Sequence, residues 1–443
     1  MSDQPIVRAR HEHTVSRRQI IAEALHVLYR LKDHGYTAYL VGGGVRDLLL
    51  QRSPKDFDIG TNATPQEIRR LFNNCVLIGR RFRLAHILFG DTVIETSTFR
   101  RPPSHDPAAP DLLQTEDNEF GAPAEDAFRR DFTINGLFYN IEDFSVIDYV
   151  GGLADLDARI VRAIGDPEVR FREDPVRMLR AIRFAARLDF AIEDETMAAL
   201  SRCRREILKA SKPRLVEEIF RLFKFNAGER AVRLLWQTGM LEDLLPEIAA
   251  YLRASPDPEN ALLWRYLHFS AEQNGEEWEE IIVALFFPLI LDRYQTTPSR
   301  ISCHDLQVGI SEVITPFMDR VGVPRRVRDL VRLIITTQYR FYARGKRKNF
   351  SRSRFAAQAW FPATLKLFTI NTNIFTDAAA EDLDKWQDLM RREGGDVRAR
   401  ELAKTTGNPR RRRRGGKRHH RREERAAPPE TLPRSIEEAA EES

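Results

Sequence analysis

The hydrophobic pattern of the first hundred residues changes repeatedly between a helical period and a strand period. Apolar residues recur at helical spacing from Ile21 to Leu31, which predicts a helix that is capped by Ser16 and Gln19 and ends at Gly35. Thr64 and Pro65 predict the start of a later helix that runs to about residue 72. The predicted strands are residues 39–41, 56–58, 85–89, 92–99, 138–141 and 145–150.

Beyond about residue 167 the apolar spacing is helical almost throughout, and no repeat of fixed length is present. Residues 101–127 are rich in Pro, Asp, Glu and Gly, which predicts an exposed loop. Helices and strands alternate before this loop and helices follow it, so the pattern predicts an α/β or α+β domain followed by a helical part. The predicted helices cover 178–188, 197–208, 215–225 and 231–244 and continue less regularly to about 395.

The composition is that of a soluble protein of two or three domains. The chain has 443 residues, of which 42% are hydrophobic. Cys75, Cys203 and Cys303 lie far apart without a ligand pattern, so we expect reduced core thiols in a cytoplasmic protein. The N-terminus has no apolar signal segment and no apolar stretch approaches the length of a membrane span, so no membrane partner is expected.

The positive charge is concentrated near the C-terminus. The net charge is +5, but residues 410–425 contain ten Lys or Arg and two Glu, a local charge of +8 that leaves −3 for the rest. Apolar residues are almost absent from about Thr405, so we expect a disordered tail that binds nucleic-acid phosphates; a solubility or degradation tail is the alternative. The tail residues expected to make these contacts are Arg410, Arg411, Arg412, Arg413, Arg414, Lys417, Arg418, Arg421 and Arg422.

Two aspartates and a glycine turn carry the clearest chemistry. Residues two apart in a strand project to one side, so Asp56 and Asp58 would aim both carboxylates at one point. Hard oxygen ligands of this kind suit Mg²⁺ bound to a nucleoside triphosphate. The turn at residues 42–44 would offer backbone N–H groups to the phosphates. A third acidic group is needed, and Glu95 and Asp131 are both candidates.

A second group of charged residues opens the helical part. If Pro175 begins a helix, then Arg177, Arg180 and Arg183 fall on one face, with Asp174 just before it. A carboxylate and a guanidinium together form an acceptor and donor pair for the edge of a base. The remaining arginines would hold phosphates, and a solvated basic helix face is the alternative.

Four motifs in order resemble those of the class II nucleotidyltransferases of the DNA polymerase beta superfamily. This family comprises bacterial poly(A) polymerases and CCA-adding tRNA nucleotidyltransferases. The resemblance covers residues 16–225, and its motifs are Leu40–Asp47, Asp56–Asp58, Arg129–Asn135 and Glu173–Arg177.

The resemblance implies roles for individual residues. By it, Asp56 and Asp58 bind two Mg²⁺ ions and Asp131 is the further acidic residue. Arg130 and Asn135 contact the triphosphate and ribose of ATP, and the base is selected by the pair at positions 174 and 177. The residues expected to bind the nucleotide are Gly43, Gly44, Arg46, Arg130, Asn135, Asp174, Arg177, Arg180 and Arg183.

The triple glycine, the segment 78–86 and the arginine-rich end are similar to the poly(A) polymerase branch. We therefore expect AMP transfer from ATP to RNA 3′ ends; a CCA-adding or partial C- or A-adding enzyme and a non-catalytic RNA-binding adaptor are the alternatives. The expected fold is α+β, with a nucleotidyltransferase head on a short mixed sheet and all-helical neck and body domains. The predicted parts are a mobile N-terminus (1–15), the head (16–166), the base-selecting neck (167–230), the RNA-binding body (231–404) and the disordered tail (405–443).

Overall fold

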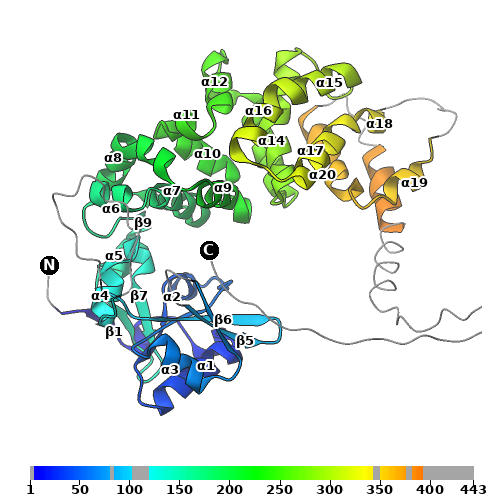
Figure 1. Cartoon of the computed structure of the whole chain (residues 1–443). Helices are drawn as coiled ribbons and strands as arrows, with labels where there is room; N and C mark the ends of the chain where they lie inside the picture. Colours follow the sequence, from blue (N-terminus) through cyan, green and yellow to red (C-terminus); the bar gives the residue numbers. More distant parts are fainter. Residues whose placement is uncertain (1–3, 80–83, 102–118, 343–349, 376–381, 393–443) are drawn as a thin grey trace, which may run out of the picture. The chain divides into compact units, whose positions relative to one another are not determined.

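A mixed sheet of eight strands forms the framework of the N-terminal part (Figure 1). The computed structural model describes residues 4–79, 84–101, 119–342, 350–375 and 382–392. Neighbouring strands of the sheet are antiparallel except β3 and β6, which run parallel. In spatial order the strands are β1 (Ile6–Arg8), β8 (Val146–Asp148), β7 (Leu137–Asn140), β2 (Ala38–Val41), β3 (Asp58–Thr61), β6 (Thr92–Thr98), β5 (Leu84–Phe89) and β4 (Cys75–Ile78).

Two helices, α1 (Ala22–Asp33) and α3 (Pro65–Leu71), pack on one face of this sheet. Side chains alternate between the faces of a strand, so Ile59, Ile87 and Ile94 point into the core beneath these helices. The residues next to them, among them Asp58 and Glu95, belong to the opposite face. The alternation therefore gives the sheet one packed face and one face that carries carboxylates.

The rest of the described chain is helical, apart from a short parallel pair of β9 (Ile160–Val161) and β10 (Ala191–Ile192). The helices of the head are completed by α2 (Gly43–Leu49), α4 (Pro123–Phe128) and α5 (Gly152–Ala158). The later helices are α6 (Pro167–Glu173), α7 (Val176–Leu188), α8 (Asp194–Cys203), α9 (Lys212–Arg221), α10 (Gly228–Gln237), α11 (Met240–Leu244), α12 (Pro246–Ala254), α13 (Leu262–Glu272), α14 (Trp278–Arg293), α15 (Cys303–Gly309), α16 (Thr315–Val321), α17 (Arg325–Thr336), α18 (Tyr339–Tyr342), α19 (Arg352–Ala356) and α20 (Phe361–Ile374).

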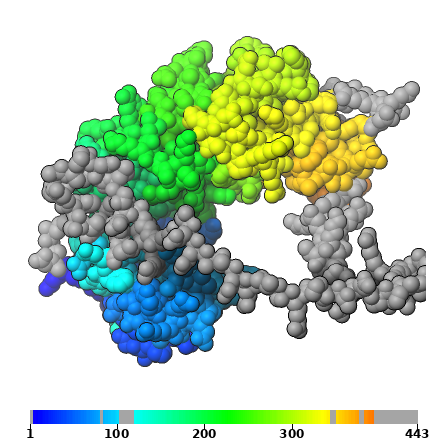
Figure 2. All heavy atoms as spheres, in the orientation of Figure 1, coloured from blue at the N-terminus to red at the C-terminus, as the bar shows by residue number. Residues whose placement is uncertain are grey.

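Helix α14 lies at the centre of the later helices. Every residue from Ile281 to Leu291 is buried, as expected for a helix that is apolar on all sides. Helices α13, α17 and α20 surround it, and the helices from α10 to α17 form a continuous packed surface (Figure 2). Within the described residues, no helix combines the length and apolarity needed to cross a membrane.

The N-terminal predictions need correction. Residues 1–15 were expected to be mobile, but Ile6–Arg8 pairs with β8 because the edge of the sheet offers free backbone groups. Ser16 and Gln19 do form a capping box, but it caps a 3₁₀ turn, and α1 begins later at Ala22. The sheet is also larger than predicted, because the pattern missed both β1 and β4.

Three further expectations differ from the structure or lie outside it. Cys303 is exposed, whereas Cys75 and Cys203 are buried as expected. The helix predicted over 231–244 is broken at Gly239, whose φ of 73° ends α10. The predicted tail and most of the loop at 101–127 lie outside the described residues, as do residues 80–83 of the segment that favours the poly(A) branch.

Candidate active site

Three carboxylates gather on the open face of the sheet. Ile59 of β3 pairs in register with Thr96 of β6, so Asp58 and Glu95 stand one residue earlier on the two parallel strands. The prediction of a strand over residues 56–58 is wrong, because β3 begins at Asp58 and Asp56 precedes it in an exposed position; Phe57 between the aspartates is buried. Burial, followed by the negative charge of Glu95, raises the pKa of Asp58 to about 6. Glu95 is therefore the acidic candidate that lies beside the aspartate pair.

The glycine turn lies against both Asp56 and Arg130. Gly42 has a φ of 72°, which favours glycine, and a Cβ there would lie 2.7 Å from Nη1 of Arg130. A Cβ on Gly44 would lie 3.3 Å from the carbonyl oxygen of Asp56. Helix α2 starts directly after Gly42 without a side-chain cap, so the predicted phosphate cradle has the required backbone form.

Several guanidinium groups face the carboxylates. Burial, followed by repulsion from Arg100, Arg130 and other arginines, lowers the pKa of Arg129 to about 9. Burial lowers the pKa of Arg100, and the negative charges of Asp126 and Glu95 oppose this shift. Arg100 therefore lies near Glu95 of the carboxylate group. Positive charges held this close favour an anion between them, and a triphosphate is such an anion.

Asp131 pairs with an arginine of α7, between the head and that helix. Its Oδ2 accepts from Nε of Arg180 at 2.6 Å, and its Oδ1 accepts from Nδ2 of Asn135 at 2.9 Å. Burial raises the pKa of Asp131, but the Arg180 guanidinium and the Asn135 hydrogen bond outweigh it and hold the pKa at about 2. The carboxylate is thus occupied by an internal ion pair.

Arg46 extends the same network into α2. Its side chain is 2% exposed, and it donates to Asp47 at 2.7 Å and to Oδ1 of Asn135 at 2.5 Å. Asp47 in turn accepts from Arg187 of α7 at 2.9 Å. Arg46 and Asn135 therefore lie in a buried connection between the head and α7, and the Arg46 side chain does not face solvent.

Each of the four charged residues at the start of α7 has a partner within the chain. Arg180 pairs with Asp131, as above, and Arg183 lies 3.4 Å from the carboxylate of Glu218. Arg177 donates to Glu173 at 2.8 Å. Asp174 accepts from Arg214 at 2.8 Å through Oδ2, whereas its buried Oδ1 has no hydrogen-bond partner. One oxygen of Asp174 is therefore left to accept a hydrogen bond.

The oxygen donors fit a magnesium ion that is shared with a triphosphate. In the described part of the chain, no group of three or more His, Cys, Asp or Glu side chains is arranged to enclose a metal ion. Mg²⁺ commonly takes only one or two carboxylates and completes its shell with water and substrate phosphates. Asp56 and Asp58 could supply those carboxylates.

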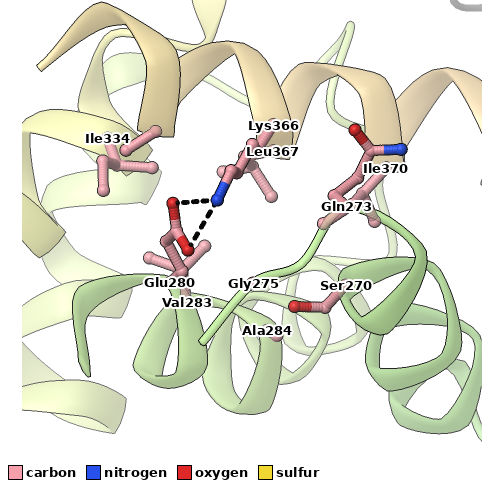
Figure 3. A pocket seen from close by; sticks show the side chains of 11 residues that line it. Ser270, Gln273, Gly275, Glu280, Val283, Ala284, Ile334, Lys366, Leu367 and Ile370 are labelled. Carbon is pink, nitrogen blue, oxygen red and sulfur yellow. Dashed lines mark hydrogen bonds and ion pairs between the residues drawn. The ribbon is translucent and has the colours of Figure 1, made fainter. Parts of the chain in front are cut away.

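A small cavity in the helical body does not compete as the active site (Figure 3). It lies among α13, α14, α17 and α20, and Glu280 and Lys366 form an ion pair of 2.8 Å at its wall. Its volume of about 10 Å³ is close to that of one water position, so it cannot hold a nucleotide.

The sequence patterns missed several residues of this region. The group of arginines near the carboxylates also includes Arg100 and Arg129. Two arginines that are distant in sequence bind acidic residues of this region: Arg187 binds Asp47, and Arg214 binds Asp174. Arg129 stands inside a recognised motif and could have been selected. The other three have no local signal, because only the fold brings them to their partners.

The chain matches three sequence families that are described by their relation to poly(A) polymerases. "Poly A polymerase head domain" matches residues 38–162. "Probable RNA and SrmB- binding site of polymerase A" matches residues 189–252. "Polymerase A arginine-rich C-terminus" matches residues 302–425. The first match contains both the glycine turn and the three carboxylates.

Relatives and solved structures agree with these matches. Poly(A) polymerase I of Escherichia coli O6:H1 is 38% identical over 401 residues, which cover 86% of this chain and 85% of that protein. A CCA-adding enzyme of Lactobacillus gasseri is 35% identical over 61% of this chain and 65% of its own length. The crystal structure of the Bacillus stearothermophilus CCA-adding enzyme in complex with CTP is 26% identical, covers 87% of this chain and 88% of its own, and has a TM-score of 0.59. The chain therefore belongs to the bacterial poly(A) polymerase family and is a nucleotidyltransferase enzyme.

Proposed function

We propose that the enzyme is a template-independent poly(A) polymerase that transfers AMP from ATP to the 3′ hydroxyl of RNA and releases pyrophosphate. The observation that carries the proposal is the meeting of three carboxylates with a group of arginines at the glycine turn. Such a site presents negative charge to metal ions and positive charge to a triphosphate. The identity to a poly(A) polymerase over most of the chain favours adenylation within the family.

Asp56 and Asp58 are the proposed ligands of two Mg²⁺ ions. When bound, these ions supply a lowered pKa of the 3′ hydroxyl and neutralise charge on the leaving pyrophosphate. Glu95 stands beside Asp58 and completes the acidic group. Arg129 and Arg130 would hold the triphosphate against the turn at Gly42, so that the α-phosphorus faces the hydroxyl.

Roles differ for the residues of the buried network. Asp131, Arg46 and Asn135 were expected to contact metal or nucleotide, but their side-chain partners are one another, Asp47 and Arg180. We assign them to positioning the head against α7. Asp174 remains the proposed base reader, because its Oδ1 has no hydrogen-bond partner and can accept from the exocyclic amino group of adenine once the side chain turns out of its buried position.

The CCA-adding enzymes provide the second candidate function. A CCA-adding relative at 35% identity and the fold of a CCA-adding enzyme bound to CTP both favour it. Cytosine also carries an exocyclic amino group, so the free oxygen of Asp174 does not separate the two bases.

One assay separates the candidates. The purified enzyme is given labelled ATP or CTP, with an unstructured RNA or with a tRNA that lacks its 3′-terminal CCA. A poly(A) polymerase extends the unstructured RNA with ATP and uses CTP poorly on either RNA. Equal use of CTP and ATP, restricted to the tRNA, would overturn the proposal and favour the CCA-adding function.

A further inference from the structure

An exposed aromatic side chain stands in a strained turn between α9 and α10. Phe225 is 52% exposed and has a φ of 60°, and Asn226 after it has a φ of 59°. Bulky residues rarely adopt this left-handed conformation, and strain of this kind persists only where the surroundings enforce it. A strained backbone that holds an apolar ring in solvent therefore points to a function for Phe225.

Contacts to the loop before α14 enforce the conformation. The N–H of Phe225 donates to Oε1 of Glu276 at 2.5 Å, and Nζ of Lys224 donates to the carbonyl oxygen of Glu276 at 3.0 Å. Nearby, Phe220 and Trp278 stack with their ring centroids 4.1 Å apart. The turn is thus fixed from the body side, and the ring of Phe225 has a defined position.

Arg187 orients the ring from the other side. Its guanidinium carbon lies 4.1 Å from the centroid of the Phe225 ring, and the same side chain donates to the buried carboxylate of Asp47. The guanidinium covers one face of the ring. Just over half of Phe225 is accessible, so a large part of the side chain remains in solvent beside the guanidinium.

A second positive charge lies at the end of α7, the helix whose Arg187 covers the ring. The guanidinium of Arg52 donates to the carbonyl oxygens of Arg187 and Leu188 at 3.2 and 3.5 Å. Both of these acceptors are neutral oxygens, so the charge of Arg52 is available to a phosphate. An exposed aromatic ring beside a cation is the combination that holds one nucleotide of a single strand.

We propose that Phe225 is a stacking platform for a nucleobase of the RNA substrate, with Arg52 beside it for a backbone phosphate. The proposal rests on the proposed function only in taking RNA as the substrate. The incoming base is read near Asp174, before the start of α7, whereas Arg187 lies near its end. The thirteen residues from Asp174 to Arg187 span about 20 Å of helix, which corresponds to about six stacked nucleotides. The platform therefore takes a base several nucleotides upstream of the 3′ end.

The test compares Phe225→Leu with Phe225→Trp in the full-length enzyme. Leucine keeps the apolar bulk and the strained backbone but removes the ring, whereas tryptophan keeps a ring. For an RNA of fifteen or so nucleotides, we expect Phe225→Leu to raise KM for RNA about 10-fold, with KM for ATP unchanged, and Phe225→Trp to stay near wild type. For a primer of two or three nucleotides, which is too short to reach the ring, the two variants should match wild type.

A fluorescent purine placed at single positions of the RNA reports the contact directly. Its quenching on binding should be largest about six nucleotides from the 3′ end and should be lost in Phe225→Leu. Leu208→Ala, which removes another exposed apolar side chain, is the matched control and should change none of these values. Arg52→Gln should flatten the dependence of log affinity on log salt by about one phosphate contact.

Two results would overturn the platform. One is unchanged KM and quenching in Phe225→Leu; the other is a fall of kcat that is equal for long and short primers, which would mean that Phe225 acts only through Arg187 and Asp47. Failure of the proposed function is distinguishable. In that case the wild type extends only tRNA with C and A, while quenching by the fluorescent purine still reports whether RNA reaches Phe225.

Discussion

Asp131→Asn should destabilise the enzyme more than it alters the chemistry of the site. The substitution keeps the shape of the side chain but removes the charge that pairs with Arg180 at 2.6 Å. Asn135 can still bond to the remaining oxygen. Arg180 is left beside a neutral group, so the connection between the head and α7 loses the Asp131–Arg180 ion pair.

The expected loss follows from burial. Breaking a buried ion pair by removing one partner costs about 3–5 kcal/mol. The side chain of Asp131 is 8% exposed but that of Arg180 is 34% exposed, so water compensates part of the charge and the lower end, about 3 kcal/mol, applies. For domains of this size, the melting temperature should fall by about 10 °C.

The same pair gives a pH dependence with a defined sign. The pKa of Asp131 is about 2 in the folded protein, below its value in the unfolded chain. Its ionised form therefore stabilises the fold above about pH 4, and about 2 kcal/mol is lost as the pH falls from about 4 to 2. Asp131→Asn cannot show this contribution, so its stability should change less with pH over that window than that of the wild type.

Thermal unfolding of four proteins measures the effect: the wild type, Asp131→Asn, Arg180→Gln and the double variant. The double variant should lose less stability than the two single variants added together, because each single variant leaves one partner unpaired and the double variant leaves none. Glu95→Gln is the matched control and should abolish AMP addition at an unchanged melting temperature, since its side chain is 45% exposed. A fully stable but inactive Asp131→Asn would refute the reasoning and make Asp131 the third catalytic carboxylate.

Three other predictions follow from the site and the tail. Asp56→Ala or Asp58→Ala should lower the rate of AMP addition by several orders of magnitude in a Mg²⁺-containing assay, while the circular dichroism spectrum of the folded protein stays unchanged; near-normal turnover would contradict the metal assignment. Arg129→Gln should raise KM for ATP at least 10-fold with unchanged RNA affinity, and an unchanged KM would show that the triphosphate binds elsewhere. A chain ended at Asn408 should bind RNA more weakly, with a shallower salt dependence, and keep its turnover at saturating RNA; retention of both affinity and salt slope would favour a solubility or degradation tail.

Local sequence was sufficient for most elements near the active site. The apolar run before Gly42 became β2, and the cap at Thr64 and Pro65 became the start of α3. The break in φ at Gly42 was also predictable, because a strand that turns directly into a helix needs a residue free of a Cβ. These features depend on residues close together in the chain.

The choice between Glu95 and Asp131 could not be made from the sequence. Both lie in strand-like or motif contexts, and their roles depend on which strand pairs with β3. The parallel pairing of β3 with β6 brings Glu95 to Asp58, whereas Arg180 from a helix 49 residues away takes Asp131. The carboxylate of Glu95 repels that of Asp58, whereas the carboxylate of Asp131 is neutralised by Arg180. The spacing of residues along the chain does not show this difference.

The sequence by itself determined the family, the motif carboxylates and the basic character of the tail. Tertiary structure alone decided which charges meet. Arg187 binds Asp47 across 140 residues, and Arg214 binds Asp174 across 40. The energy of an ion pair depends on distance and burial, and both are set by how the helices pack on the head. Patterns along the chain fix which side of an element is apolar, but only packing fixes which polar groups face one another.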